Sequence, residues 1–169
     1  MVDTSDGCGP APSSRLVRLE FPEQPKLSGF SRADLVISGV DHARSSYEVR
    51  IFLNNPGAGP DTERTETQGY AGRFHVFGHG GCFGDVGHCD VPAASTDPTD
   101  LRPAHPLTPL DTYVTITPAL RRILVAGSRL TSATLVPLSL PPRREDRAFA
   151  PELFGFRSVR LQLYLTPLD

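Results

Sequence analysis

Histidine and cysteine side chains gather in one short stretch of the chain. Four of the five histidines and two of the three cysteines lie between positions 75 and 105. Imidazole and thiolate are the groups that bind zinc and copper in proteins. Five glycines between positions 78 and 87 let the backbone bend, so ligands close in sequence can converge on one point. The stretch therefore predicts a bound transition metal, with copper favoured and zinc as the alternative.

The predicted metal ligands are His75, His79 and His88, followed by Cys82, Cys89 and His105. Two imidazoles and a thiolate with a weak further ligand suit copper, whereas a closed four-coordinate set of nitrogen and sulfur suits zinc. The paired Cys-x2-Cys and His-x3-5-His pattern of zinc fingers is absent, which favours copper. Asp85 and Asp90 are predicted to accept hydrogen bonds from the ligand imidazoles.

Each of these residues also has an ordinary structural interpretation. His75 ends an expected strand and His79 follows in a glycine-rich loop, where a histidine is often simply hydrogen-bonded or solvated. The spacing of Cys82 and Cys89 permits a disulfide that closes the loop, and the histidines would then still be free to bind. His105 has the surroundings of a surface histidine in a proline-rich segment, and aspartates in glycine-rich turns commonly accept bonds from backbone donors.

Short stretches with period-2 alternation, separated by turn residues, predict about seven β-strands. They cover residues 16–21, 34–40, 47–53, 70–77, 111–117, 129–138 and 156–165. The clearest is 47–53, which places its apolar side chains on one face with Glu48 and Arg50 on the other. His42, between two expected strands, is interpreted as a turn residue and not as a ligand.

One short helix is expected near residues 118–126. Thr117 is predicted as its N-cap, Pro118 as its first helical residue and Gly127 as its stop. Many strands and one helix indicate an all-β fold, an antiparallel β-sandwich. Residues 1–14 are interpreted as a loose N-terminal tail, and 15–169 as a single domain that carries the metal-binding loop 75–105.

Composition and charge argue against several classes of function. A formal net charge of −2 and a pI near 6.2 give no basic surface for nucleic acid or an anionic membrane. No apolar run approaches the ~20 residues of a membrane helix. The first residues form neither a basic nor an apolar segment of a signal peptide, so the chain as given is expected to be cytoplasmic, or a mature or excised piece of a longer protein. The glycines of 78–84 lack the following helix that a phosphate-binding loop needs.

Five segments in a fixed order resemble a known family. They are Tyr-Glu-Val-Arg-Ile-Phe-Leu-Asn at 47–54, Tyr-Ala-Gly-Arg-Phe-His-Val at 70–76, Thr-Ile-Thr-Pro-Ala-Leu at 115–120, Thr-Leu-Val-Pro-Leu at 134–138 and Val-Arg-Leu-Gln-Leu at 159–163. This order is similar to that of the C-terminal β-domain of plant-type polyphenol oxidases and bacterial tyrosinase-family proteins.

The resemblance implies a β-sandwich that packs over a copper site, or a stand-alone relative of such a domain. The stretch 79–89 departs from the family pattern as an insertion, which indicates more than a shielding role. In the family the dicopper centre uses six histidines in a separate helical domain. With five histidines and no expected helix bundle, this chain is not expected to carry that centre alone.

Three functions follow as alternatives. The leading one is a copper-binding tyrosinase-family protein. If a coordination position on the copper is open, it acts as a mononuclear copper oxidoreductase on phenolic or peptide-like substrates. If the coordination is closed, it stores or delivers copper. The second is a non-catalytic lid or copper-delivery domain for a separate tyrosinase-type dicopper domain. The third is an interaction domain whose metal is structural or whose loop is pinned by a disulfide, or else a stand-alone enzyme whose zinc activates a water with Asp85 as the candidate base.

Overall fold

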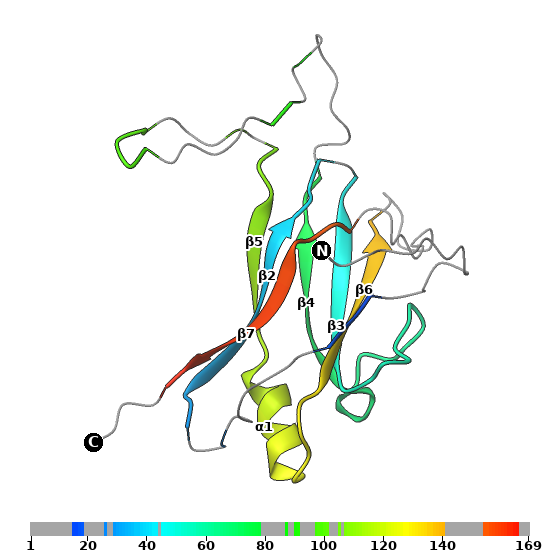
Figure 1. Cartoon of the computed structure of the whole chain (residues 1–169). Helices are drawn as coiled ribbons and strands as arrows, with labels where there is room; N and C mark the ends of the chain where they lie inside the picture. Colours follow the sequence, from blue (N-terminus) through cyan, green and yellow to red (C-terminus); the bar gives the residue numbers. More distant parts are fainter. Residues whose placement is uncertain are drawn as a thin grey trace, which may run out of the picture.

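The computed structural model describes residues 15–18, 26, 29–43, 45–78, 87, 90–91, 97–101, 105, 107–140 and 154–165. Within these residues, seven strands form two antiparallel sheets that pack face to face, as the alternation predicts (Figure 1). The strands are β1 (Arg15–Arg18), β2 (Arg32–Val40), β3 (Tyr47–Leu53), β4 (Tyr70–Val76), β5 (Leu110–Thr115), β6 (Ser132–Ser139) and β7 (Ser158–Tyr164). One sheet has the order β1-β6-β3-β4 and the other the order β5-β2-β7. The predicted antiparallel β-sandwich is therefore confirmed.

The core lies between the two sheets and is built by the alternating positions of the central strands. On β3, Tyr47, Val49 and Ile51 are fully buried, which confirms the face expected for them. On β2, Leu35 and Ile37 are equally buried and belong to the same hydrophobic cluster. Removing each such aliphatic side chain from water contributes about 1.5–3 kcal/mol, so the central strand of each sheet adds substantially to the stability of the sandwich.

The two sheets approach each other most closely at one edge, where β4 meets β5. A Cβ atom on Gly72 would lie 2.9 Å from Cγ1 of Val114. Only glycine therefore fits this position without a shift of the Val114 side chain. Along β7, by contrast, the core-facing Val159, Leu161 and Leu163 are only partly buried.

The short helix, α1 (Thr117–Val125), lies where expected but begins differently. Its N-cap is Ile116, and no side chain caps it. Thr117, predicted as the cap, is bonded to β2 instead, because its hydroxyl accepts from the backbone N–H of Ala33 at 2.8 Å. The predicted stop is correct: Gly127 has φ +68°, and Ser128 N bonds to Ile123 O at 3.0 Å in a Schellman ending.

The connection between β3 and β4 folds back over the outer face of the four-stranded sheet and contains the 3-10 helix η1 (Glu66–Gln68). Ala58 from this connection is buried against Phe52 and Val136 of the sheet. Arg50 also reaches it, donating from Nη1 to Pro60 O at 3.0 Å. Part of this outer face is therefore a second, smaller apolar layer.

Two ends of the sandwich can be told apart in Figure 1. The upper end carries the turn between β2 and β3 and the end of β4, since Tyr47 is paired with Val76. The lower end carries α1 and the β3–β4 connection. No helix among the described residues is long and apolar enough to cross a membrane. The tail predicted at residues 1–14 lies outside the described residues.

Candidate functional site

Three of the eight residues predicted for the metal site lie within the described chain: His75, Asp90 and His105. The other five, outside the described residues, are His79, Cys82, Asp85, His88 and Cys89. Among the residues that the structure describes, no three histidine, cysteine, aspartate or glutamate side chains come together as a metal-binding group. The predicted site is therefore represented in the structure mainly by His75 and its surroundings.

His75 lies on β4, directly opposite Glu48 of β3 in the four-stranded sheet. Both side chains point to the outer face, away from the core. The Nε2 atom of His75 is 3.0 Å from Oε2 of Glu48. The Glu48 side chain is 0% exposed, whereas that of His75 is 36% exposed. The pair thus joins a fully buried carboxylate to an imidazole that solvent reaches.

Two arginines complete the surroundings of the Glu48 carboxylate. Arg50 donates from Nε to Oε1 at 2.9 Å, and Arg73 donates from Nη1 to Oε2 at 3.2 Å. A buried charge without such partners would cost several kcal/mol. Because these guanidinium groups offset the carboxylate, Glu48 can remain ionised although water does not reach its side chain. We call Glu48, Arg50, Arg73 and His75 the Glu48 cluster.

The contact between His75 and Glu48 fixes which nitrogen of the imidazole ring carries a proton. An ionised carboxylate only accepts hydrogen bonds, so the Nε2–H of His75 must be the donor. In a neutral ring with its proton on Nε2, the Nδ1 atom keeps a lone pair. A neutral imidazole nitrogen with a lone pair is the form that binds transition metals.

Further bonds hold the chain on both sides of the Glu48 cluster. Where the chain leaves β4, Gly78 N donates to Oγ of Ser46 at 3.0 Å. In the β2–β3 turn, the phenol of Tyr47 donates to Asp41 O at 2.5 Å. Burial raises the pKa of Tyr47 well above its usual value, so this donor keeps its proton at neutral pH. Gly78, at the start of the glycine-rich stretch, is therefore hydrogen-bonded to the residue that precedes β3.

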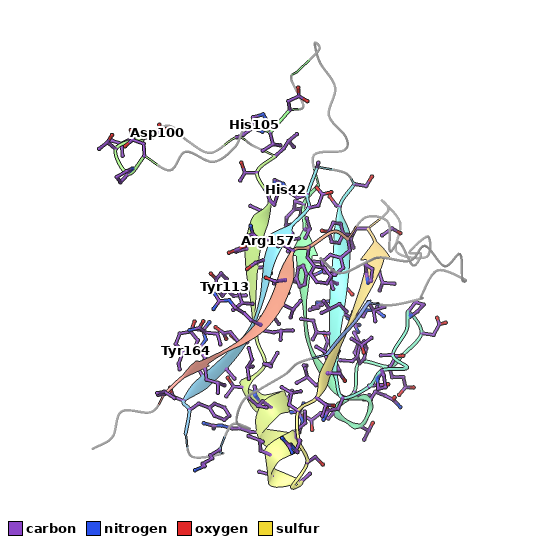
Figure 2. The ribbon with its side chains drawn as sticks, in the orientation of Figure 1. His42, Asp100, His105, Tyr113, Arg157 and Tyr164 are labelled. Atoms are coloured by element: carbon purple, nitrogen blue, oxygen red, sulfur yellow. The ribbon has the colours of Figure 1, made fainter. Side chains whose placement is uncertain are left out.

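The other two described histidines, His42 and His105, lie near the upper end of the molecule (Figure 2). His42 is buried, and its Nε2–H donates to Thr108 O at 2.8 Å, because a carbonyl oxygen only accepts. The predicted turn position of His42 is correct. In His105, Nδ1 accepts from the backbone N–H of Leu107 at 3.1 Å, which leaves Nε2 as the nitrogen that could face a metal. Asp90 is exposed, and its backbone N–H donates to Gly87 O at 3.1 Å.

A hollow of about 540 Å³ lies at the opposite, lower end, between η1 and α1. Polar residues that line it are bonded to one another. Asn55 Nδ2 donates to Gln68 O at 2.9 Å, and Arg122 forms an ion pair with Glu66 at 2.9 Å. The hollow includes none of the predicted metal ligands. It is therefore separate from the Glu48 cluster.

Sequence reasoning found His75 but missed the partners that surround it. It placed Glu48 and Arg50 on the face opposite the core, without a sign that Glu48 is buried there. A signal did exist: Glu48 and Arg50 are spaced by two residues on one strand, and Arg73 and His75 have the same spacing on the next. Side chains at such positions meet across neighbouring strands, but only the pairing register, which sequence left open, brings the two pairs together.

Comparison of the chain with protein-family models, with curated proteins and with solved structures gives no match. The resemblance to the polyphenol-oxidase β-domain stays a prediction.

Proposed function

We propose that this protein binds copper at the upper end of its β-sandwich, with His75 as one ligand through Nδ1. The observation that carries the proposal is the 3.0 Å contact between His75 Nε2 and the buried Glu48 carboxylate. Histidines that bind metals almost always donate their other N–H to a carboxylate, a carbonyl or water. His79, His88, Cys82 and Cys89 remain the proposed partners from the neighbouring stretch, with His105 as a more distant one.

The charges around His75 favour reduced copper over zinc. The Glu48 cluster contains two guanidinium groups and one carboxylate, so it is positive by one charge when His75 is neutral. Two unit charges about 8 Å apart in water repel by about 0.5 kcal/mol, and by more near a protein surface. Zn²⁺ always carries two charges, whereas reduced copper carries one and also suits the thiolates of the neighbouring stretch.

The protein's own residues would prepare the ligand. Glu48 accepts the Nε2 proton of His75 and thereby keeps Nδ1 unprotonated. Arg50 and Arg73 hold the carboxylate in place, and the bond between Gly78 and Ser46 fixes the direction in which the chain leaves β4. Copper, when bound, would supply one-electron chemistry or serve as cargo.

We propose that the protein takes part in the copper-dependent oxidation of phenols. It would act as a mononuclear oxidoreductase, or as a lid or copper-delivery domain for a separate dicopper domain. The support is the order of segments that resembles the polyphenol-oxidase β-domain. The copper would not form the family's dicopper centre, since five histidines are too few for its six imidazoles.

Metal titration of purified protein tests the proposal. The expected result is one copper ion per chain, bound more tightly than zinc in the presence of a reductant. His75→Gln should weaken copper binding at least tenfold, which corresponds to about 1.4 kcal/mol. The matched control is His42→Gln, which removes a histidine whose ring is buried and bonded to Thr108 O, and it should bind copper as the wild type does.

A second variant tests the neighbouring stretch. Replacing His79 and His88 together with alanine should abolish stoichiometric binding. Copper affinity that is unchanged in both this variant and His75→Gln would remove the basis for the site.

A further inference from the structure

We propose that Glu48 is the positioning residue of the metal site: it selects the tautomer of His75 and so decides which nitrogen binds the ion. This inference rests on the proposed function. It gives a functional role to Glu48, which is buried although the alternation of β3 alone predicts a solvent-exposed position for it.

The first step of the argument is the cost of burying Glu48. Its side chain is 0% exposed on the outer face of the sheet. Replacing a buried ion pair by apolar residues of similar size is often neutral or stabilising. Stability alone therefore gives no reason for a carboxylate here, and a role in orienting a neighbour does.

The second step is the geometry of the contacts. Arg50 is bonded to Oε1, while Arg73 and His75 share Oε2, at 3.2 and 3.0 Å. Two guanidinium groups from neighbouring strands therefore fix the carboxylate before any ligand arrives. Oε2 of Glu48 is therefore held in position as a hydrogen-bond acceptor for His75, so Nε2 of His75 keeps its proton.

The third step concerns the exposed part of the ring. The side chain of His75 remains 36% exposed although one of its nitrogens is engaged with a fully buried group. Within the described residues no hydrogen bond reaches Nδ1 of His75. That nitrogen is available to a ligand without breaking an existing bond, in contrast to Nδ1 of His105, which accepts from Leu107 N.

Nitrogen-15 NMR of the metal-free wild type tests the tautomer directly. At a pH where the ring is neutral, the expected spectrum has His75 in a single tautomer with its proton on Nε2. A proton on Nδ1, or a rapidly exchanging mixture of tautomers, would overturn the assignment without reference to any metal or variant.

Variants then connect the tautomer to binding. Glu48→Leu should release the ring to a mixture of tautomers and weaken copper binding by about 10–100-fold. Glu48→Gln keeps an oxygen acceptor for the Nε2–H, so it should retain the tautomer and lose less affinity than Glu48→Leu. If Glu48→Leu does not fold, the wild-type spectrum together with Glu48→Gln still decides the question.

Asp34→Asn is the matched control. Asp34 is also a fully buried carboxylate in an ion pair with an arginine, but it lies on β2 in the other sheet. Asp34→Asn should change neither the tautomer of His75 nor the copper affinity. If the wild type and Glu48→Leu bind copper equally well, the role of Glu48 is overturned but the proposed function is not. Wild-type protein that binds no metal would overturn the proposed function and this role with it.

Discussion

At the scale of single residues, Asp34 links the stability of the fold to pH. Its side chain is 1% exposed, and the guanidinium of Arg32 contacts both of its oxygens, at 2.8 and 2.9 Å. The hydrogen bond from Arg32 lowers the pKa of Asp34, although burial acts in the opposite direction. Because the folded pKa lies below the unfolded value of about 3.9, the contribution is present above that value and is lost as pH falls through the folded pKa.

Asp34→Asn should therefore destabilise the protein at pH 7 by about 1.5–3 kcal/mol, the usual worth of a hydrogen bond to a charged group. The difference from the wild type should shrink when pH falls below about 4. Urea unfolding of both proteins at pH 7 and at pH 3 measures it. An equal difference at both pH values would show that the charge of Asp34 plays no part.

Arg73 gives a second prediction at this scale, on the selectivity of the proposed site. Its Nη1 atom shares Oε2 of Glu48 with His75, so its charge lies close to an ion bound at His75. In Arg73→Gln, Arg50 still holds the Glu48 carboxylate through Oε1. This variant should raise the affinity for Zn²⁺ by about two- to fivefold, and that for reduced copper by less, because repulsion scales with the charge of the ion.

Competition titrations of both metals against a chelator measure this change. Arg129→Gln, an exposed arginine just beyond α1 at the lower end, serves as the control and should leave both affinities unchanged. A loss of zinc affinity in Arg73→Gln would contradict the electrostatic argument.

At the scale of elements, the ends of strands and helices can be predicted from the sequence where they depend on local pattern. The alternation of β3 and the turn residues around it are local, and the strand Tyr47–Leu53 matches its prediction at both ends. The C-terminal end of α1 is equally local, because Gly127 alone supplies the left-handed residue of its ending. The N-cap was predicted wrongly at Thr117 because that hydroxyl has a partner from β2, Ala33, that no local pattern reveals.

In the candidate site, too, some residues could be predicted from a local pattern of sequence and others could not. His75 could be predicted, since residue type and clustering are visible in one stretch of sequence. Glu48 and Arg73 could not, because they are 25 residues apart and meet only through the register of two strands. Register depends on the packing of the whole sheet.

The turn into β4 provides a prediction on backbone conformation. Gly69 has φ +77°, and an added Cβ would collide with the carbonyl oxygen of Leu53. Gly127 has φ +68° but open space around it, and Gly59 has open space and no such conformation. Alanine at these positions should destabilise the protein by about 2–4, about 1–2 and about 0 kcal/mol respectively.

Thermal or urea unfolding of Gly69→Ala, Gly127→Ala and Gly59→Ala measures this series. The order decides the outcome, since it separates the cost of the left-handed backbone from the cost of the collision. Equal stability of the Gly69 and Gly127 variants would mean that the β3–β4 connection shifts easily to accept a side chain.

At the scale of the whole molecule, the two ends of the sandwich have different characters. The upper end joins the Glu48 cluster and the β2–β3 turn, and His42 and His105 lie near it (Figure 2). The lower end carries α1 and the hollow of about 540 Å³. A ligand at one end would leave the other accessible, which suits a domain that binds a metal and also contacts a second protein.

The composition of the whole chain limits which copper chemistry it performs. The chain has five histidines, and the ring of His42 is buried and bonded to Thr108 O. The described part of the chain holds one α-helix, of nine residues. The family that the sequence is predicted to resemble has a dicopper centre of six imidazoles on a helical bundle. We therefore predict that the isolated protein binds copper as single ions and does not oxidise simple monophenols.

Three measurements on copper-loaded protein check this prediction. Metal analysis should give no more than one copper per chain, and oxidised samples should give the paramagnetic resonance of isolated Cu²⁺, because paired ions would be magnetically coupled and silent. Assays with tyrosine should show no activity above that of free copper. An absorption band of an oxygen-bridged copper pair together with rapid tyrosine oxidation would contradict the prediction. If the isolated protein is inactive, mixing it with a separate tyrosinase domain distinguishes the remaining roles, since a lid would inhibit that domain and a delivery domain would load it with copper.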